Sequence, residues 1–144
     1  MRQLVLALVM AGTILGTASA QTRPLALADY YRVETVNGTA LSPDGRTVVY
    51  VRTFIVESEN RRHSEIWAVP ADGSEPPRRL TNPAFSSNGP RWSPDGRLLA
   101  FSSRRRVVTA GGPQDESTWF LRMDSAGGEA FQIPGVEGTP VFSP

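Results

Sequence analysis

The chain has 144 residues, the length of one ordinary domain, and it carries 15 basic against 14 acidic residues, a formal net charge of +1. All 15 basic residues are arginines, and a balance so near zero argues against a nucleic-acid or anionic-membrane protein, whose affinity requires surplus cations. Cysteine is absent, which excludes disulfides and thiolate metal sites. With His63 as the single histidine, we expect no metal site and no cofactor.

Residues 1–20 have the pattern of an export signal. Arg2 precedes the apolar run Leu4–Leu15, and the segment ends in Ala18-Ser19-Ala20, the small residues that a signal peptidase accepts. The apolar run is shorter than the roughly 20 residues that span a bilayer. The sequence therefore predicts cleavage at the end of this segment and a periplasmic or secreted chain that begins at Gln21, with an uncleaved anchor as the alternative.

Residues 21–38 are interpreted as a lead-in to the first structural unit. Within them, Leu25–Arg32 is rich in alanine and leucine and contains two tyrosines, which suits a short helix or an extended entry. Across the whole chain, 13 Gly and 12 Pro residues favour turns and short strands over long helices.

A motif then recurs with a period of about fifty residues. Leu41-Ser42-Pro43-Asp44-Gly45-Arg46 returns as Trp92-Ser93-Pro94-Asp95-Gly96-Arg97, and Phe142-Ser143-Pro144 begins a third copy. A second element recurs in phase, with Ile66–Val69 ahead of Asp72-Gly73 and Phe120–Met123 ahead of Gly127-Gly128. Two elements that share one period indicate a repeat architecture more strongly than either does alone.

Each copy of the motif has the residues of a tight hairpin turn. Proline presets φ near about −65°, aspartate bonds nearby backbone amides, and glycine adopts the left-handed conformation that closes the turn. Apolar runs on both sides complete a β-hairpin signature. We interpret these positions as structural turns with glycine at positive φ: Ser42, Pro43, Asp44 and Gly45, then Ser93, Pro94, Asp95 and Gly96.

Each period divides into four strand-like runs. The first period has Thr39–Ser42, Thr47–Thr53, Ser64–Val69 and Arg78–Thr81, and the second has Pro90–Ser93, Leu98–Ser103, Thr118–Met123 and Ala130–Ile133. Four antiparallel strands in about fifty residues is the size of one β-propeller blade. The predicted fold class is all-β, with blades at 39–87 and 88–138 and the start of another at 139–144, so we expect a fragment of a larger propeller.

The repeats resemble the propeller of the prolyl oligopeptidase family of serine peptidases, in particular its acylaminoacyl-peptidase and dipeptidyl-peptidase members. The resemblance rests on the two Ser-Pro-Asp-Gly copies with their apolar runs and on four further segments, Tyr30-Tyr31-Arg32, Ile66–Pro70, Arg79-Leu80-Thr81 and Gly127–Phe131. TolB-like periplasmic propellers have similar repeats.

The family resemblance implies an α/β-hydrolase domain in the same parent chain, with a nucleophile in Gly-x-Ser-x-Gly followed by Asp and His. This sequence contains no Gly-x-Ser-x-Gly, so no catalytic residue is assigned. The implied function is a non-catalytic, substrate-gating propeller of an exported peptidase, whose partners are that hydrolase domain and short peptides. The alternative is a TolB-like scaffold that binds proteins and has no enzymatic activity. The sequence downstream would discriminate between the two.

Arg104, Arg105 and Arg106 are the candidate substrate-binding residues, since guanidinium groups bind carboxylates with two parallel hydrogen bonds. A solvated loop is the simpler interpretation of this triplet. We expect His63 to be an exposed loop or strand-end residue. Glu57, Glu59, Arg61 and Arg62 are interpreted as a surface loop, and Trp67, Trp92 and Phe120 as packing between blades.

Overall fold

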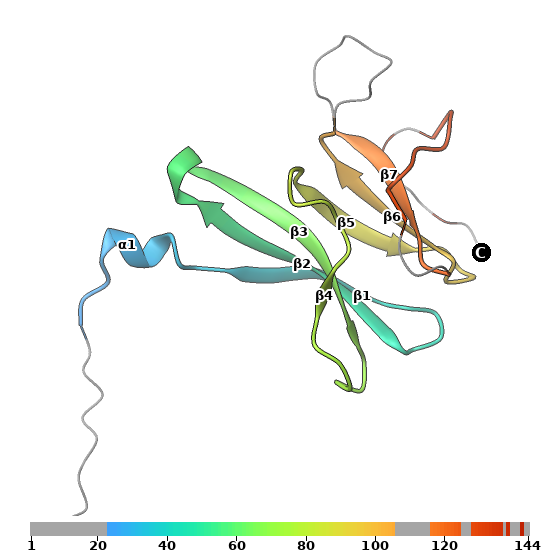
Figure 1. Cartoon of the computed structure of the whole chain (residues 1–144), viewed down its shortest axis with the longest axis horizontal. Helices are drawn as coiled ribbons and strands as arrows, with labels where there is room; N and C mark the ends of the chain where they lie inside the picture. Colours follow the sequence, from blue (N-terminus) through green and yellow to red (C-terminus); the bar gives the residue numbers. More distant parts are fainter. Residues whose placement is uncertain (1–22, 106–115, 125–127, 137, 139–141, 143–144) are drawn as a thin grey trace, which may run out of the picture.

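The computed structural model describes residues 23–105, 116–124, 128–136, 138 and 142 (Figure 1). The predicted signal segment, the predicted N-terminus at Gln21, Arg106 and Ser143-Pro144 of the third repeat lie outside the described residues. Among the residues that are described, no helix is long and apolar enough to cross a membrane.

The described chain forms two antiparallel sheets that follow each other in sequence (Figure 1). The first has the order β1-β2-β3-β4 and the second the order β5-β6-β7. The strands are β1 (Thr35–Leu41), β2 (Thr47–Val56), β3 (Arg61–Pro70), β4 (Arg78–Arg79), β5 (Ser87–Trp92), β6 (Leu98–Ser103) and β7 (Ser117–Arg122). A short helix, α1 (Leu27–Tyr30), and one 3-10 turn, η1 (Glu57–Glu59), are the other regular elements described.

Consecutive antiparallel meanders of this size, packed face to face, are propeller blades, so the predicted all-β fold class is confirmed. In the second sheet the expected fourth strand at Ala130–Ile133 is reduced to one bridge. Phe120 and Phe131 exchange both backbone hydrogen bonds there, at 2.8 and 2.9 Å.

The hairpin of β2 and β3 is longer than the sequence predicts, and its extension includes residues that we had interpreted as a loop. Arg61 pairs with Val56, and Arg62 pairs with Ile55, so both arginines belong to β3. Only η1 and Asn60, which has a φ of 44°, form the connection. The charged side chains suggested a loop. Strand pairing at an exposed hairpin end needs only backbone groups, so this segment forms a strand without apolar side chains.

The first strand of each sheet, β1 or β5, contains a bulge that the sequence pattern did not predict. The pairing of β1 with β2 shifts between Asn37 and Ala40, and the pairing of β5 with β6 shifts between Asn88 and Arg91. Each bulge contains an Asn-Gly dipeptide whose glycine has a positive φ, 57° at Gly38 and 60° at Gly89. The first strand consequently begins at Thr35, four residues before the predicted start at Thr39.

The core lies between the sheets, where β5 packs against β1, β2 and β3. Its buried apolar residues are Val49, Val51, Ile66 and Ala68 from the first sheet and Leu99, Phe101 and Leu121 from the second. Trp92 packs against this cluster, as predicted, and its indole Nε1 donates a hydrogen bond to the Ala40 carbonyl at 3.3 Å. This bond links β1 to β5, the first strands of the two sheets.

The two Ser-Pro-Asp-Gly turns have the same hydrogen bonds. Ser42 Oγ donates to Asp44 Oδ1 at 2.5 Å and accepts from the Thr47 amide at 2.9 Å. In the second turn, Ser93 Oγ donates to Asp95 Oδ1 at 2.6 Å and accepts from the Leu98 amide at 2.9 Å. The φ angles of the closing glycines, 73° at Gly45 and 71° at Gly96, confirm the predicted left-handed conformation.

The serine of each turn is a buried hub, a role that sequence reasoning did not identify. Ser42 is 7% exposed and Ser93 is 6% exposed, although the aspartates beside them face solvent. The hydroxyl satisfies a backbone amide and an aspartate at once. The aspartate in turn accepts from the amide two residues further on, Arg46 or Arg97, at 3.1 Å in both turns. The pKa values of Asp44 and Asp95 are lowered, first by the serine hydroxyl and then by that amide.

Candidate functional site

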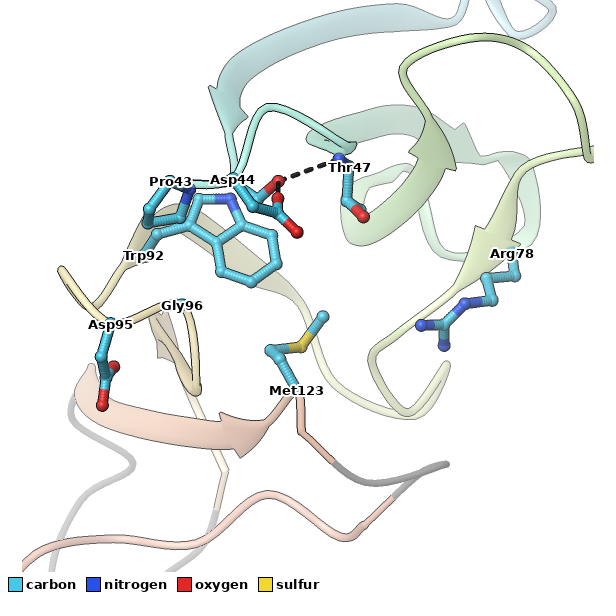
Figure 2. Close-up of a pocket in the computed structure, with 9 residues that line it drawn as sticks. Pro43, Asp44, Thr47, Arg78, Trp92, Asp95, Gly96 and Met123 are labelled. Carbon is cyan, nitrogen blue, oxygen red and sulfur yellow. Dashed lines mark hydrogen bonds between the residues drawn. The ribbon is translucent and has the colours of Figure 1, made fainter.

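The two turns and the indole of Trp92 enclose a small pocket at one end of the sheet pair (Figure 2). Its volume is about 200 Å³. Figure 2 shows the indole lying between the two turns, and Met123 and Arg78 also line the pocket. The serine hydroxyls and the Oδ1 atoms of the aspartates in these turns bind each other and the turn backbone. We assign this pocket to the packing of the turns.

A larger groove lies at the opposite end, where β3, β5 and β7 begin and β6 ends. Its volume is about 630 Å³, within the range of about 300–1,000 Å³ that is common for small-ligand sites. Both sheets line it, and most of the lining residues are polar or charged: Arg61, Arg62, Ser64, Ala84, Phe85, Ser86, Asn88, Ser103, Arg104 and Glu116. We call it the arginine groove.

The described part of the arginine triplet separates into two environments. Arg104 is exposed and lines the arginine groove, whereas the neighbouring Arg105 is only 7% exposed. The guanidinium carbon of Arg105 lies 5.4 Å from the ring centroids of Phe85 and Phe101 and 5.2 Å from that of Trp119. The expectation of a solvated loop is therefore wrong for Arg105, whose side chain is enclosed by aromatic rings.

Burial lowers the pKa of Arg105, and the charge of Glu129 opposes that shift. Arg105 Nε also donates to Ser103 Oγ at 3.4 Å. Among the described residues it has no ion-pair partner, so its charge is stabilised by ring faces and by a hydroxyl. Arg105 is a structural residue beneath the groove, and Arg104 is the member of the pair that can contact a ligand.

Sequence reasoning missed the contribution of Arg61 and Arg62, which line the groove from the first sheet. Arg61 forms an ion pair with Glu59 at 2.5 Å on the hairpin surface. Arg62 and Arg104 have no ion-pair partner within the described ranges. No sequence signal joined these positions, because they are more than forty residues apart and meet only when the sheets pack.

Hydroxyl groups hold the floor of the groove rigidly. Ser103 Oγ donates to the Ser86 carbonyl at 2.8 Å and links β6 to the segment before β5. Ser86 Oγ accepts from the Ser64 amide and lies 3.3 Å from His63 Nδ1. These bonds fix the backbone that carries the arginines and leave the guanidinium groups as the principal donors toward a ligand.

His63 is buried, with 5% exposure, so the expectation of an exposed loop or strand-end histidine is wrong. Its ring packs edge-on against Phe54, at a centroid distance of 5.4 Å. Within the described part of the chain, its Nε2 has no hydrogen-bond partner, and it lies 4.0 Å from an oxygen of the buried Glu65. Glu65 itself accepts from the indole of Trp67 at 3.0 Å and pairs with Arg79 at 3.3 Å. The sequence concealed this burial, because its neighbours Arg61 and Arg62 are strongly polar.

The other aromatic residues that we expected between blades, Trp67 and Phe120, lie on the sheet faces that do not meet each other in the described part of the chain. Trp67 is on the face of the first sheet that is turned away from the second sheet. Phe120 is on the face of the second sheet that is turned away from the first, where its ring centroid lies 6.0 Å from that of Phe131.

Nothing in the described residues resembles a metal centre, since no group of three His, Cys, Asp or Glu side chains there could hold an ion.

Comparison with known proteins relates the chain to peptidases. It is 31% identical over 121 residues to the uncharacterized peptidase YuxL of Bacillus subtilis, covering 81% of this chain and 17% of that protein. It is 33% identical over 102 residues to dipeptidyl-peptidase 5 of Porphyromonas gingivalis, covering 66% of this chain and 15% of that protein. The chain thus spans less than a fifth of the length of the curated relatives it matches.

Among solved structures, the chain resembles a protein of Agrobacterium tumefaciens described as a TolB candidate. The two are 27% identical with a TM-score of 0.49, over 72% of this chain and 31% of that one. No family model matches the chain. The identities establish a relationship to proteins named as peptidases, and the sheets establish an all-β fold of propeller blades.

Proposed function

We propose that this chain is a non-catalytic, substrate-gating propeller portion of an exported serine peptidase of the prolyl oligopeptidase family. The observation that carries the proposal is its 31–33% identity to two proteins named as peptidases, of which it spans only a small part. The rest of such a protein has room for the remaining blades and for an α/β-hydrolase domain.

In this proposal, the hydrolase domain supplies the chemistry. Its serine attacks the scissile carbonyl, with a histidine as general base and an aspartate that orients the histidine. The blades supply walls, because a closed ring of sheets around a narrow passage admits short, extended peptides and excludes folded proteins. The hydroxyl hubs of Ser42 and Ser93 keep the hairpins of these walls in fixed positions.

The test uses the full-length parent protein and the 144-residue chain side by side. We expect the parent to hydrolyse short chromogenic peptides and acyl-amino-acid substrates, and to lose that activity after reaction with a fluorophosphonate. The 144-residue chain, which lacks Gly-x-Ser-x-Gly, is expected to show neither turnover nor labelling. A parent that ends after its last blade and is not labelled would favour the protein-binding scaffold instead.

Export is tested on the same parent protein. Cleavage after Ala20 predicts a mature N-terminus at Gln21, which mass spectrometry of the periplasmic or secreted product would detect. A mature protein that retains Leu4–Leu15 would mean that the segment is an anchor.

A further inference from the structure

The arginine groove has a surplus of positive charge that the described protein does not neutralise. Its lining contains three arginines against the single carboxylate of Glu116. The Glu59 carboxylate occupies Arg61, but Arg62 and Arg104 have no ion-pair partner among the described residues. A fourth guanidinium, that of Arg105, lies buried next to Ser103 beneath the groove. The summed field of these groups favours an anion.

The polar groups around the arginines select a ligand that accepts hydrogen bonds. Guanidinium groups donate and never accept, and the hydroxyls of Ser64, Ser86 and Ser103 are already engaged within the protein. A carboxylate matches the planar fork of an arginine with two parallel bonds, whereas an ammonium group would meet like charge. The ligand chemistry that fits is therefore an anion with two neighbouring acceptor oxygens, as in a carboxylate.

We propose that the arginine groove binds a carboxylate of a peptide, either its carboxyl terminus or an acidic side chain, between Arg62 of the first sheet and Arg104 of the second. This inference rests on the proposed function, which makes peptides the molecules that pass the blades. Since the two arginines come from different sheets, the bound carboxylate also bridges the blades. Asn88 and Phe85 border the same groove and can contact the adjoining peptide.

The experiment measures peptide binding by calorimetry on the full-length parent protein, after reaction with fluorophosphonate so that no peptide is hydrolysed. The probes are three N-acetylated tripeptides: trialanine with a free carboxyl terminus, amidated trialanine, and amidated Ala-Ala-Asp. We expect both carboxylate-bearing peptides to bind about tenfold more tightly than the neutral amide, and the difference to shrink as salt is raised.

The variant pair R62Q and R104Q, combined, should remove that preference and leave the weak binding of the neutral amide unchanged. R104K keeps the charge and loses the fork, so we expect an intermediate preference. The matched control is R46Q, an exposed arginine in the turn at the other end of the sheets, which should behave as wild type. Thermal melts of every variant establish that the protein is folded.

Three results would overturn the proposal: equal affinity for all three peptides, a carboxylate preference that survives in the folded double variant, or displacement of the peptides by inorganic phosphate. Inorganic phosphate is the competitor, and displacement of the peptides at equal concentration would identify a general anion site instead. Failure of the proposed function is read separately, from absent fluorophosphonate labelling and absent turnover, and does not affect these affinities.

Discussion

Each sheet places an arginine over the tryptophan of its third strand, and the two stacks differ in how the charge is satisfied. Trp67 pairs with Tyr50 in the first sheet, and Trp119 pairs with Phe101 in the second, one repeat later. Arg52 lies 5.6 Å from the ring of Trp67, and Arg105 lies 5.2 Å from that of Trp119. The two stacks therefore occupy corresponding places in the two blades.

The surroundings of the two arginines explain their different electrostatics. The Arg52 side chain is 34% exposed and pairs with Glu34 at 2.5 Å, and this partner raises the pKa of Arg52. The Arg105 guanidinium is enclosed by three aromatic rings, and burial lowers its pKa. The comparison teaches that both repeats keep the place where a guanidinium stacks on a tryptophan. The arginine that supplies the guanidinium comes from a different position in each repeat, and its electrostatic role differs.

The largest expected effect is at Arg105. Arg105→Ala should destabilise the full-length parent by about 3 kcal/mol, because it opens a cavity among three rings and removes a desolvated cation–π contact. Arg105→Met, which keeps most of the volume and loses the charge, should recover much of that loss. Denaturant melts measure both variants. Losses below about 0.5 kcal/mol for Arg105→Ala would mean that the side chain behaves as an ordinary surface residue.

The next largest effect is expected in the two Ser-Pro-Asp-Gly turns, which have the same geometry in both sheets. Gly45→Val and Gly96→Val should each cost about 1–3 kcal/mol, because both positions have a positive φ that a β-branched residue adopts poorly. A Cβ would meet no atom within 4 Å at Gly45 and only Pro43 at 3.6 Å at Gly96, so backbone conformation and not crowding sets the cost. Clearly unequal losses in denaturant melts would contradict the equivalence of the two turns.

Arg52→Ala should cost much less than Arg105→Ala, about 0.5–1 kcal/mol, since its ion pair with Glu34 is largely solvated. Because salt screens exposed charges, this loss should also shrink at high ionic strength, whereas the loss at Arg105 should persist. Melts at low and high salt, with both variants in parallel, test the contrast. A salt-independent loss at Arg52 would place its charge in the protein interior.

The smallest effect is a pH dependence shared by the two turns. The folded pKa values of Asp44 and Asp95 lie below the ordinary value because a serine hydroxyl and an amide bind each carboxylate. Their contribution to stability is therefore complete above the ordinary aspartate range, near about 4, and is lost as the pH falls through the lowered values. NMR titration should show both carboxylates titrating together. Separate midpoints would indicate that the hubs differ.

The turns were predictable because their geometry is local. Proline, aspartate and glycine specify a turn within four residues, and the glycine φ angles agree with that chemistry. The Asn-Gly bulges were equally local, and their 51-residue spacing was visible in the sequence, but the predicted strands began only after these glycines, at Thr39 and Pro90. The order of the strands could be predicted from the apolar runs. The extension of the β2–β3 hairpin to Arg61 and Arg62 could not, because it depends on backbone pairing and not on the type of side chain.

The arginine groove was only partly predictable, because burial depends on partners that are distant in sequence. The residues next to Arg105 in the sequence do not indicate that Phe85 and Trp119 enclose it. Those next to His63 do not indicate its contact with Ser86. Arginine is mostly exposed in folded proteins and histidine is of intermediate burial, so exposure was the reasonable expectation for both. Arg104 was correctly identified as accessible, and its neighbours from β3 could be found only from the packed sheets.

Because the serine hydroxyls of the turns bind backbone amides, hydrogen exchange at those amides can measure the opening of each hairpin. The amide protons of Thr47 and Leu98 are each held by a serine oxygen and not by a carbonyl, at 2.9 Å in both cases. Each proton can exchange with solvent only when its own turn opens. The two amides are thus matched reporters, one per blade, and the ratio of their exchange rates gives the difference in opening free energy between neighbouring blades without any mutation.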